Sequence, residues 1–84
     1  MGRSTRARPK QLGGKLRQIR VTLGLTQLEM IKALGMKGAR LHPSNISEFE
    51  SNRREPSLLV LLRYARIAGV STDVLIDDKL NVPK

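Results

Sequence analysis

Residues 26–56, TQLEMIKALGMKGARLHPSNISEFESNRREP, decide the fold of this chain, because they contain two short helical patterns on either side of a basic turn. The first pattern opens with Thr26 and Glu29, which have the spacing of a capping box. Its apolar residues then share one face, and Gly35 follows where a helix C-cap is expected. This part of the sequence predicts a helix over 26–34.

The second pattern begins at His42-Pro43-Ser44, since proline is favoured in the first turn of a helix, where its missing N–H is not needed. Ile46 and Phe49 recur at helical spacing and predict an inward face. The residues left pointing outward are polar: Ser44, Asn45, Ser47 and Glu48. A helix over 43–51 with this outer face, packed against the preceding helix, has the shape that fits a DNA major groove.

The rest of the chain predicts three further helices and no strand. Apolar spacing indicates a helix from Gln11 to about Thr22, and Pro56-Ser57 begins another that Gly69 ends. The inward stripe of that later helix is expected to be Leu58, Leu61, Leu62, Ala65 and Ala68. Ser71 is expected to cap a last helix. We therefore expect an all-α fold: a compact five-helix domain over 11–78, a disordered arm over 1–10 and a tail over 79–84.

The composition indicates a small domain with a polyanionic partner. The chain has 84 residues, no cysteine, a formal charge of +9 and a pI of about 11.2, so disulfides and thiolate metal sites are excluded. Within residues 1–20 there is no acid but a run of basic residues: Arg3, Arg6, Arg8, Lys10, Lys15, Arg17 and Arg20. The arm is therefore interpreted either as functional or as a plain solubilising tail.

No segment has the properties of a membrane anchor. The longest apolar run, Leu58 to Leu62, is far shorter than the ~20 residues of a membrane span. The N-terminus also lacks the apolar stretch of a signal peptide. We expect a cytoplasmic, nucleoid-associated protein.

Several separated pieces of the sequence resemble the lambda-repressor-like helix-turn-helix domains of bacterial and phage regulators, also called the XRE or Cro/C1 type. The resemblance covers Leu12 to about Ile76 and is carried by LRQIR, GLTQ, KALG, SNISEFE, RREPSL, LLRYAR and GVSTDVL, in this order. It implies a lambda-repressor-like fold whose second and third helices form the helix-turn-helix. It also implies a homodimer that binds double-stranded DNA at a two-fold symmetric operator. We expect a sequence-specific transcriptional regulator, with repression as its action.

The resemblance implies roles for individual residues. Its base-reading positions correspond to Pro43, Ser44, Asn45, Ser47 and Glu48. Asparagine pairs with adenine at two points and glutamate accepts from cytosine N4, whereas Pro43 offers only its ring to a thymine methyl. DNA-backbone contacts are implied for Thr26, Gln27, Ser51, Asn52, Arg53 and Arg54. Arg20 and Glu50 match a pair that forms a salt bridge between the first and third helices in several relatives, so we expect them to be structural.

The turn between the second and third helices is longer than in the family. Residues 35–41 intervene before His42-Pro43, and they add Lys37 and Arg40 beside the groove-facing helix. We interpret these two as contacts to phosphates that flank the half-site; the alternative is a solvated surface loop. His42, the sole histidine, is expected to be a helix-start residue or a phosphate neighbour and to bind no metal.

Apolar residues also occur where the family usually has polar ones. We expect a dimer interface near the fourth and fifth helices, formed by Leu59, Val60, Val74, Leu80 and Val82. The alternative is that they enlarge a small core.

Neither a catalytic constellation nor a small-molecule or cofactor site is evident, so we expect no enzyme. The rival function is a protein-interaction module of the same fold, such as an antitoxin or a transcriptional adaptor. The basic excess argues against that as the sole role, because masking a protein partner does not require a charge of +9.

Overall fold

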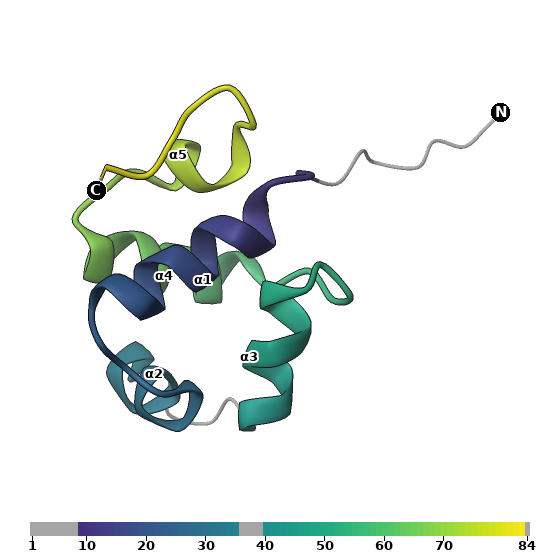
Figure 1. Ribbon diagram of the computed structural model, residues 1–84, viewed down its shortest axis with the longest axis vertical. Coiled ribbons are helices and arrows are strands. Elements are labelled where there is room, and N and C mark those ends of the chain that lie inside the picture. The colour runs from purple at the N-terminus through teal and green to yellow at the C-terminus, as the bar shows by residue number, and fades with distance from the viewer. Residues whose placement is uncertain (1–8, 36–39, 84) are drawn as a thin grey trace, which may run out of the picture.

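The computed structural model describes residues 9–35 and 40–83, and within these ranges it contains five α-helices and no strand. The helices are α1 (Leu12–Thr22), α2 (Gln27–Leu34), α3 (Pro43–Glu50), α4 (Leu58–Ala68) and α5 (Thr72–Ile76). Figure 1 shows α1 crossing the middle of the molecule in front of α4, with α5 above them and α2 and α3 below. The prediction of an all-α fold of five helices is confirmed within these ranges.

Local capping sets the ends of α2 and α4. The hydroxyls of Thr26 and Ser57 each accept the backbone N–H three residues further on, as expected of N-caps. Gly35 and Gly69 end these helices in the left-handed conformation, with φ of 62° and 70°. Ser71 precedes α5 as expected, but its side chain makes no capping hydrogen bond.

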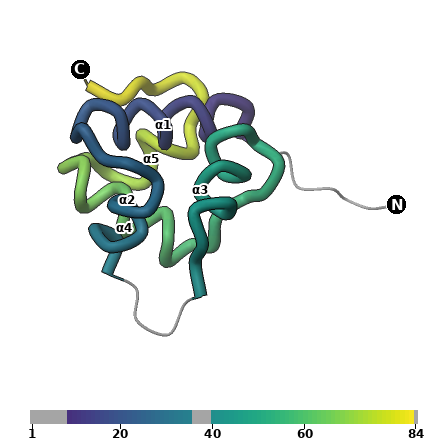
Figure 2. Tube along the Cα trace, turned by 60° about the horizontal axis from the view of Figure 1, so that its bottom comes forward, coloured from purple at the N-terminus to yellow at the C-terminus, as the bar shows by residue number. Residues whose placement is uncertain are grey.

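One hydrophobic core holds the helices together. α3 packs against both α1 and α2, and α4 packs against α1, α2 and α5. The largest fully buried side chains come from all five helices: Tyr64, Leu16, Met30, Leu34, Ile46 and Leu75. The C-terminal end of α2 and the N-terminal end of α3 lie at the same edge of the molecule (Figure 2). The core therefore positions α3 by its inner side and leaves its other side outside the bundle.

The inward stripe of α4 differs from the prediction. Leu58 is 82% exposed, whereas Val60 is only 3% exposed and packs in the core with Leu61, Tyr64 and Ala65. Residues 58–62 are all apolar, so this run contains no polar residue that would fix the rotational phase of the helix. The assignment of Val60 to a dimer interface is therefore wrong.

The N-terminus of α1 is capped by remote residues. The carboxylate of Asp78 accepts the backbone N–H groups of Lys10 and Gln11, both at 3.0 Å. The side-chain oxygen of Asn52 accepts the N–H of Gly13 at 2.9 Å. These backbone hydrogen bonds, first from Gln11 and then from Lys10, hold the pKa of the Asp78 carboxyl below its ordinary value. The start of α1 is thus fixed by the loop after α3 and by the segment after α5.

Lys15 completes this junction from the other side. Its side chain is buried, and its Nζ donates to the carbonyl oxygens of Val74 and Asp77, both at 2.8 Å. These carbonyls lie at the end of α5, where a cation is favourable. Lys15 therefore ties α1 to α5 and is not available as a surface cation.

Candidate nucleic-acid interface

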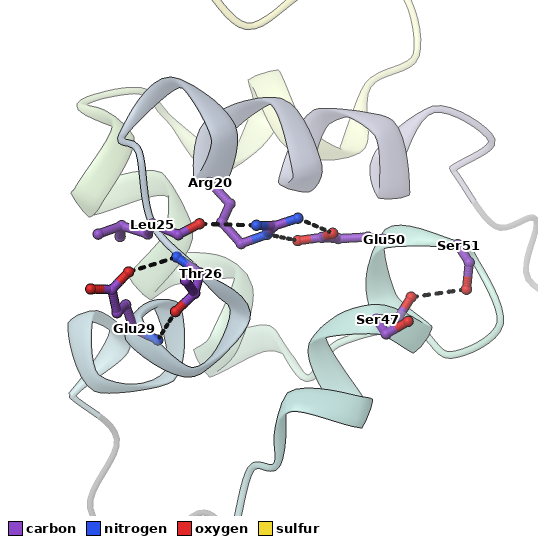
Figure 3. Close-up of polar contacts among 7 residues, drawn as sticks. All are labelled: Arg20, Leu25, Thr26, Glu29, Ser47, Glu50 and Ser51. Carbon is purple, nitrogen blue, oxygen red and sulfur yellow. Dashed lines mark hydrogen bonds and ion pairs between the residues drawn. The ribbon is translucent and has the colours of Figure 1, made fainter.

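The start of α2 holds two residues expected at the DNA backbone, Thr26 and Gln27. The Thr26 hydroxyl accepts the N–H of Glu29 at 3.1 Å, and the Glu29 carboxylate accepts the N–H of Thr26 at 2.8 Å, which completes the capping box (Figure 3). The hydrogen bond from the Thr26 backbone N–H, followed by the interaction with the Thr26 side chain, lowers the pKa of the Glu29 carboxyl. The Glu29 carboxylate thus occupies the backbone N–H of Thr26, and Gln27 follows it, half-buried.

Polar groups order the start of α3. Pro43 is the first helical residue, and the side-chain oxygen of Asn45 accepts the backbone N–H of His42 at 2.9 Å. The Asn45 amide nitrogen donates to Glu48 Oε1 at 3.3 Å. Asn45 therefore acts within the helix end itself, a role that sequence reasoning missed. The His42–Asn45 spacing is the available signal, although Asn45 replaces the usual glutamate or glutamine of a capping box.

The outer face of α3 carries the residues expected to read bases. Pro43, Ser44 and Ser47 are exposed, while Asn45 and Glu48 are half-buried. Glu48 Oε1 also lies 3.4 Å from Arg54 Nε, in an ion pair whose side chains are 39% and 60% exposed. This face therefore offers hydroxyls, a carboxylate and a guanidinium, which are groups that hydrogen-bond base edges.

The inner side of α3 is fixed by the Arg20–Glu50 pair that the sequence led us to expect. Arg20 donates from Nε to Glu50 Oε2 at 2.6 Å and from Nη2 to Oε1 at 3.0 Å, and from Nη1 to the Leu25 carbonyl at 2.9 Å (Figure 3). The two side chains are only 15% and 6% exposed. The hydrogen bonding to Glu50 raises the pKa of Arg20. Neither residue faces the outer side of α3, so the pair is structural.

The loop after α3 separates structural from exposed residues. The Ser51 hydroxyl donates back to the Ser47 carbonyl at 2.9 Å, and Asn52 adopts a left-handed φ of 62°. The Asn52 side chain bonds α1 through its oxygen, as described above, and its nitrogen donates to the Lys10 carbonyl at 3.2 Å. Arg53 and Arg54 remain exposed on this loop. Ser51 and Asn52 therefore shape the loop that presents the two arginines.

The residues of the inserted turn are only partly described. Arg40 is exposed three residues before the start of α3, and Leu41 packs against the core. Lys37 and residues 1–8 of the predicted arm over 1–10 lie outside the described residues. Lys10, placed in the arm by its sequence, is hydrogen-bonded to Asp78 and Asn52.

An apolar surface lies between α4 and α5. We call it the α4–α5 surface; a shallow groove there is lined by Leu58, Leu59, Leu61, Leu62, Thr72 and Ile76. Leu59 is 63% exposed, as its predicted interface role requires. Leu80 is also exposed, Val74 is half-buried, and Val82 packs against the core. Sequence reasoning missed Leu58 and Ile76 here, because it placed Leu58 in the core.

Lys15, Asp78 and Gly13 are the other residues that sequence reasoning missed. The sequence does hold a signal for Asp78. The predicted first helix starts at Gln11, which is not one of the short polar residues that cap a helix, so its cap has to come from elsewhere in the chain. In the described ranges, no group of three or more His, Cys, Asp or Glu side chains is placed to hold a metal ion. None of the described helices is long and apolar enough to cross a membrane.

Comparison with known proteins identifies the family. A helix-turn-helix family model matches residues 16–75, which is most of the chain and includes α2, α3 and the loop with both arginines. Comparisons with curated proteins and with solved structures gave no match. The helix order and the family match agree, and the chain belongs to the XRE, lambda-repressor-like family of helix-turn-helix DNA-binding regulators.

Proposed function

We propose that the protein is a sequence-specific double-stranded DNA-binding transcriptional regulator that places α3 in the major groove and represses by occupying its operator. The division of α3 is the observation that carries this proposal. Ile46, Phe49 and Glu50 fix its inner side, while Ser44 and Ser47 are exposed on the other. A helix held rigidly by one side, with short polar residues on the other, is suited to enter the groove.

Exposed cations support the proposal, since they provide the sequence-independent attraction to phosphates. Arg40 lies before α3, and Arg53 and Arg54 lie after it, so cations flank the helix in the chain. Phosphate contacts of this kind set the position of a protein on the duplex and make its affinity depend on salt. We assign this role to Arg40 and Arg53, with Gln27 and His42 beside them; Lys37 and the basic arm are proposed to add to it.

Sequence discrimination is assigned to the outer face of α3. Ser44 and Ser47 are adaptable hydrogen-bonding groups, Glu48 is an acceptor for cytosine N4, and Pro43 supplies an apolar contact. Asn45 is already bonded to His42 and Glu48, so these bonds fix the orientation of its amide and leave one N–H and one lone pair for adenine. We therefore expect Asn45 to contribute less to base reading than Ser44, Ser47 and Glu48.

The test is selection of bound duplexes from a random pool, followed by titration of the best duplex and of a scrambled duplex at two salt concentrations. We expect the selected duplex to bind about 1,000-fold tighter or better. Equal, salt-dependent binding of both duplexes would contradict sequence-specific recognition and leave only general nucleic-acid binding. A reporter whose promoter overlaps the selected duplex tests repression, and an increase in transcription would contradict that part alone.

We also propose a homodimer that uses the α4–α5 surface and binds a two-fold symmetric operator. Leu58, Leu59 and Ile76 are 82%, 63% and 43% exposed and line one groove, so they form a larger apolar surface than isolated exposed residues do. Leu80, which is also exposed, and Val74 are proposed to extend the interface. Sedimentation at micromolar concentration should show a dimer that Leu59→Lys dissociates. Leu28→Lys on α2, where the native side chain is 52% exposed, is the matched control. A monomer at every concentration would remove the dimer from the proposal.

The same surface favours a second candidate function, a protein-interaction module such as an antitoxin or an adaptor. In that case an apolar partner segment would cover Leu58 and Leu59. The salt-dependent titrations separate the two functions, because a pure interaction module gives no shift of any duplex at either salt concentration.

A further inference from the structure

Glu48 and Arg54 are held together on the outer face of α3 by both backbone and side chain. The Glu48 carbonyl accepts the N–H groups of Arg53 at 2.9 Å and Arg54 at 3.3 Å, so the loop folds back over this residue. The side chains then meet at 3.4 Å between Arg54 Nε and Glu48 Oε1. The guanidinium is thereby placed beside a residue of the recognition helix, although it belongs to the loop.

We propose that Arg54 and Glu48 act as one unit that reads a single G·C base pair, with Arg54 donating to guanine and Glu48 accepting from cytosine. This inference rests on the proposed function, since it names the base pair that the outer face of α3 selects. It gives Arg54 a base contact in place of the DNA-backbone contact implied by the resemblance.

The hydrogen-bonding pattern of the pair matches that of the base pair. In the major groove, guanine presents two acceptors, N7 and O6, and cytosine presents one donor, the N4 amino group. The Nε side of Arg54 faces Glu48, which leaves the two terminal nitrogens to donate as a fork. Asn45 and Arg54 both approach Glu48 Oε1, which leaves Oε2 for the cytosine amino group. The two donors of Arg54 and the acceptor of Glu48 therefore complement the two acceptors of guanine and the donor of cytosine.

The charge of the pair disfavours a phosphate as the partner of Arg54. A phosphate at this guanidinium would also approach the carboxylate of Glu48, and the like charges repel. A base edge carries no net charge and avoids this repulsion. Within the described part of the chain, Arg53 forms no ion pair, and its exposed side chain is the better phosphate contact of the two.

The test compares Arg54→Lys with Arg53→Lys, its neighbour in the same loop. Both variants keep the positive charge, and only the fork geometry is lost. Duplex selection is repeated with the wild type, both lysine variants and Glu48→Gln, and affinities are measured for duplexes that vary at one base pair each. Circular dichroism melting confirms that every variant is folded at the assay temperature.

We expect the wild type to prefer G·C at one position of each half-site, and Arg54→Lys to reduce that preference about 5- to 100-fold. Glu48→Gln should weaken the preference at the same position, and Arg53→Lys should change no position. The inference is overturned if both lysine variants weaken all duplexes equally, or if Glu48→Gln and Arg54→Lys act at different positions. A wild type without any sequence preference would instead overturn the proposed function as well, so the two failures are distinct.

Discussion

Two glutamates of α3, only two positions apart, each hold an arginine, yet the two ion pairs differ in almost every respect. The Glu50–Arg20 pair has two hydrogen bonds of 2.6 and 3.0 Å and side chains that are 6% and 15% exposed. The Glu48–Arg54 pair has one approach of 3.4 Å and side chains that are 39% and 60% exposed. Because the helix turns by about 100° per residue, these two glutamates point to different sides. A glutamate–arginine ion pair therefore fixes α3 on its inner side, whereas the ion pair on its outer side can exchange its partners for other groups.

Exposure decides what each pair contributes. An exposed pair is worth between zero and about 1 kcal/mol, because water solvates both charges when they separate. Removing one partner of a shielded pair leaves the other charge with little water, which costs far more. We therefore assign stability to the inner pair and DNA recognition to the outer one.

Glu50→Gln should give the largest effect, a loss of about 3 kcal/mol in the free energy of unfolding, because Arg20 keeps its charge in a shielded position. Urea denaturation measures this loss. Glu48→Gln is the matched control, since it makes the same chemical change in the exposed pair, and it should cost less than about 1 kcal/mol. Equal losses for the two variants would abolish the distinction between the sides of α3.

Gly13→Ala tests the inner side at the point where α1 meets the end of α3. A Cβ at Gly13 would lie 2.7 Å from the Glu50 carbonyl oxygen and 2.8 Å from that of Phe49. We expect a loss of about 1–3 kcal/mol from this overlap. Gly14→Ala is the control, because a Cβ there meets nothing within 4 Å, and alanine should stabilise α1 by up to about 1 kcal/mol. Thermal melting of both variants should show shifts of opposite sign.

Asp78→Asn tests the capped start of α1, the helix that carries Arg20. The pKa of Asp78 is lowered in the folded protein, so its stabilisation is complete above the unfolded value and is lost as the pH falls through the folded value. The variant should melt several degrees lower at neutral pH, and the difference should shrink below the ordinary carboxyl pKa of 3.8. Asp73→Asn, at an exposed residue of α5, is the control. A difference that does not change with pH would refute the role of the charge.

The smallest effect is expected in the salt dependence of binding to random duplexes. Arg53→Gln should reduce the slope of log affinity against log salt by about one unit, as for one lost phosphate contact. Arg54→Gln should reduce it by less, because Glu48 already neutralises this guanidinium. Fluorescence anisotropy over a series of salt concentrations measures both slopes. Equal reductions would place Arg54 on a phosphate and remove the contrast between the two arginines.

Features encoded locally could be predicted from the sequence. The capping box of Thr26 and Glu29, the C-cap at Gly35 and the start of α3 at Pro43 each depend on residues within four positions of one another. The spacing of neighbouring residues indicates where these helices start and end, and the helix bounds were predicted from it. The family resemblance then supplied the pairing of Arg20 with Glu50, which spacing alone does not give.

Features that depend on remote partners or on helix phase could not be predicted. Asp78 caps α1 from 67 residues away, and Lys15 looks like a surface cation until α5 is placed beside it. Residues 58–62 are all apolar, so the sequence does not indicate which of them face the core. Leu58 and Val60 were therefore assigned to the wrong sides of α4. Asn45 was assigned only to base reading, because asparagine replaces the usual glutamate or glutamine of a capping box and the His42–Asn45 spacing is therefore a weak signal for the hydrogen bond that the structure shows.

The bonds of Asp78 to Lys10 and Gln11 also decide how the domain can be cut for experiments. The family match covers residues 16–75, and a fragment trimmed to those limits would lack the first turn of α1 as well as Asp78, which caps it. It would also lack Val82, whose carbonyl accepts from Gln18 of α1 at 3.3 Å. Expression boundaries should therefore begin no later than Pro9 and extend at least to Pro83.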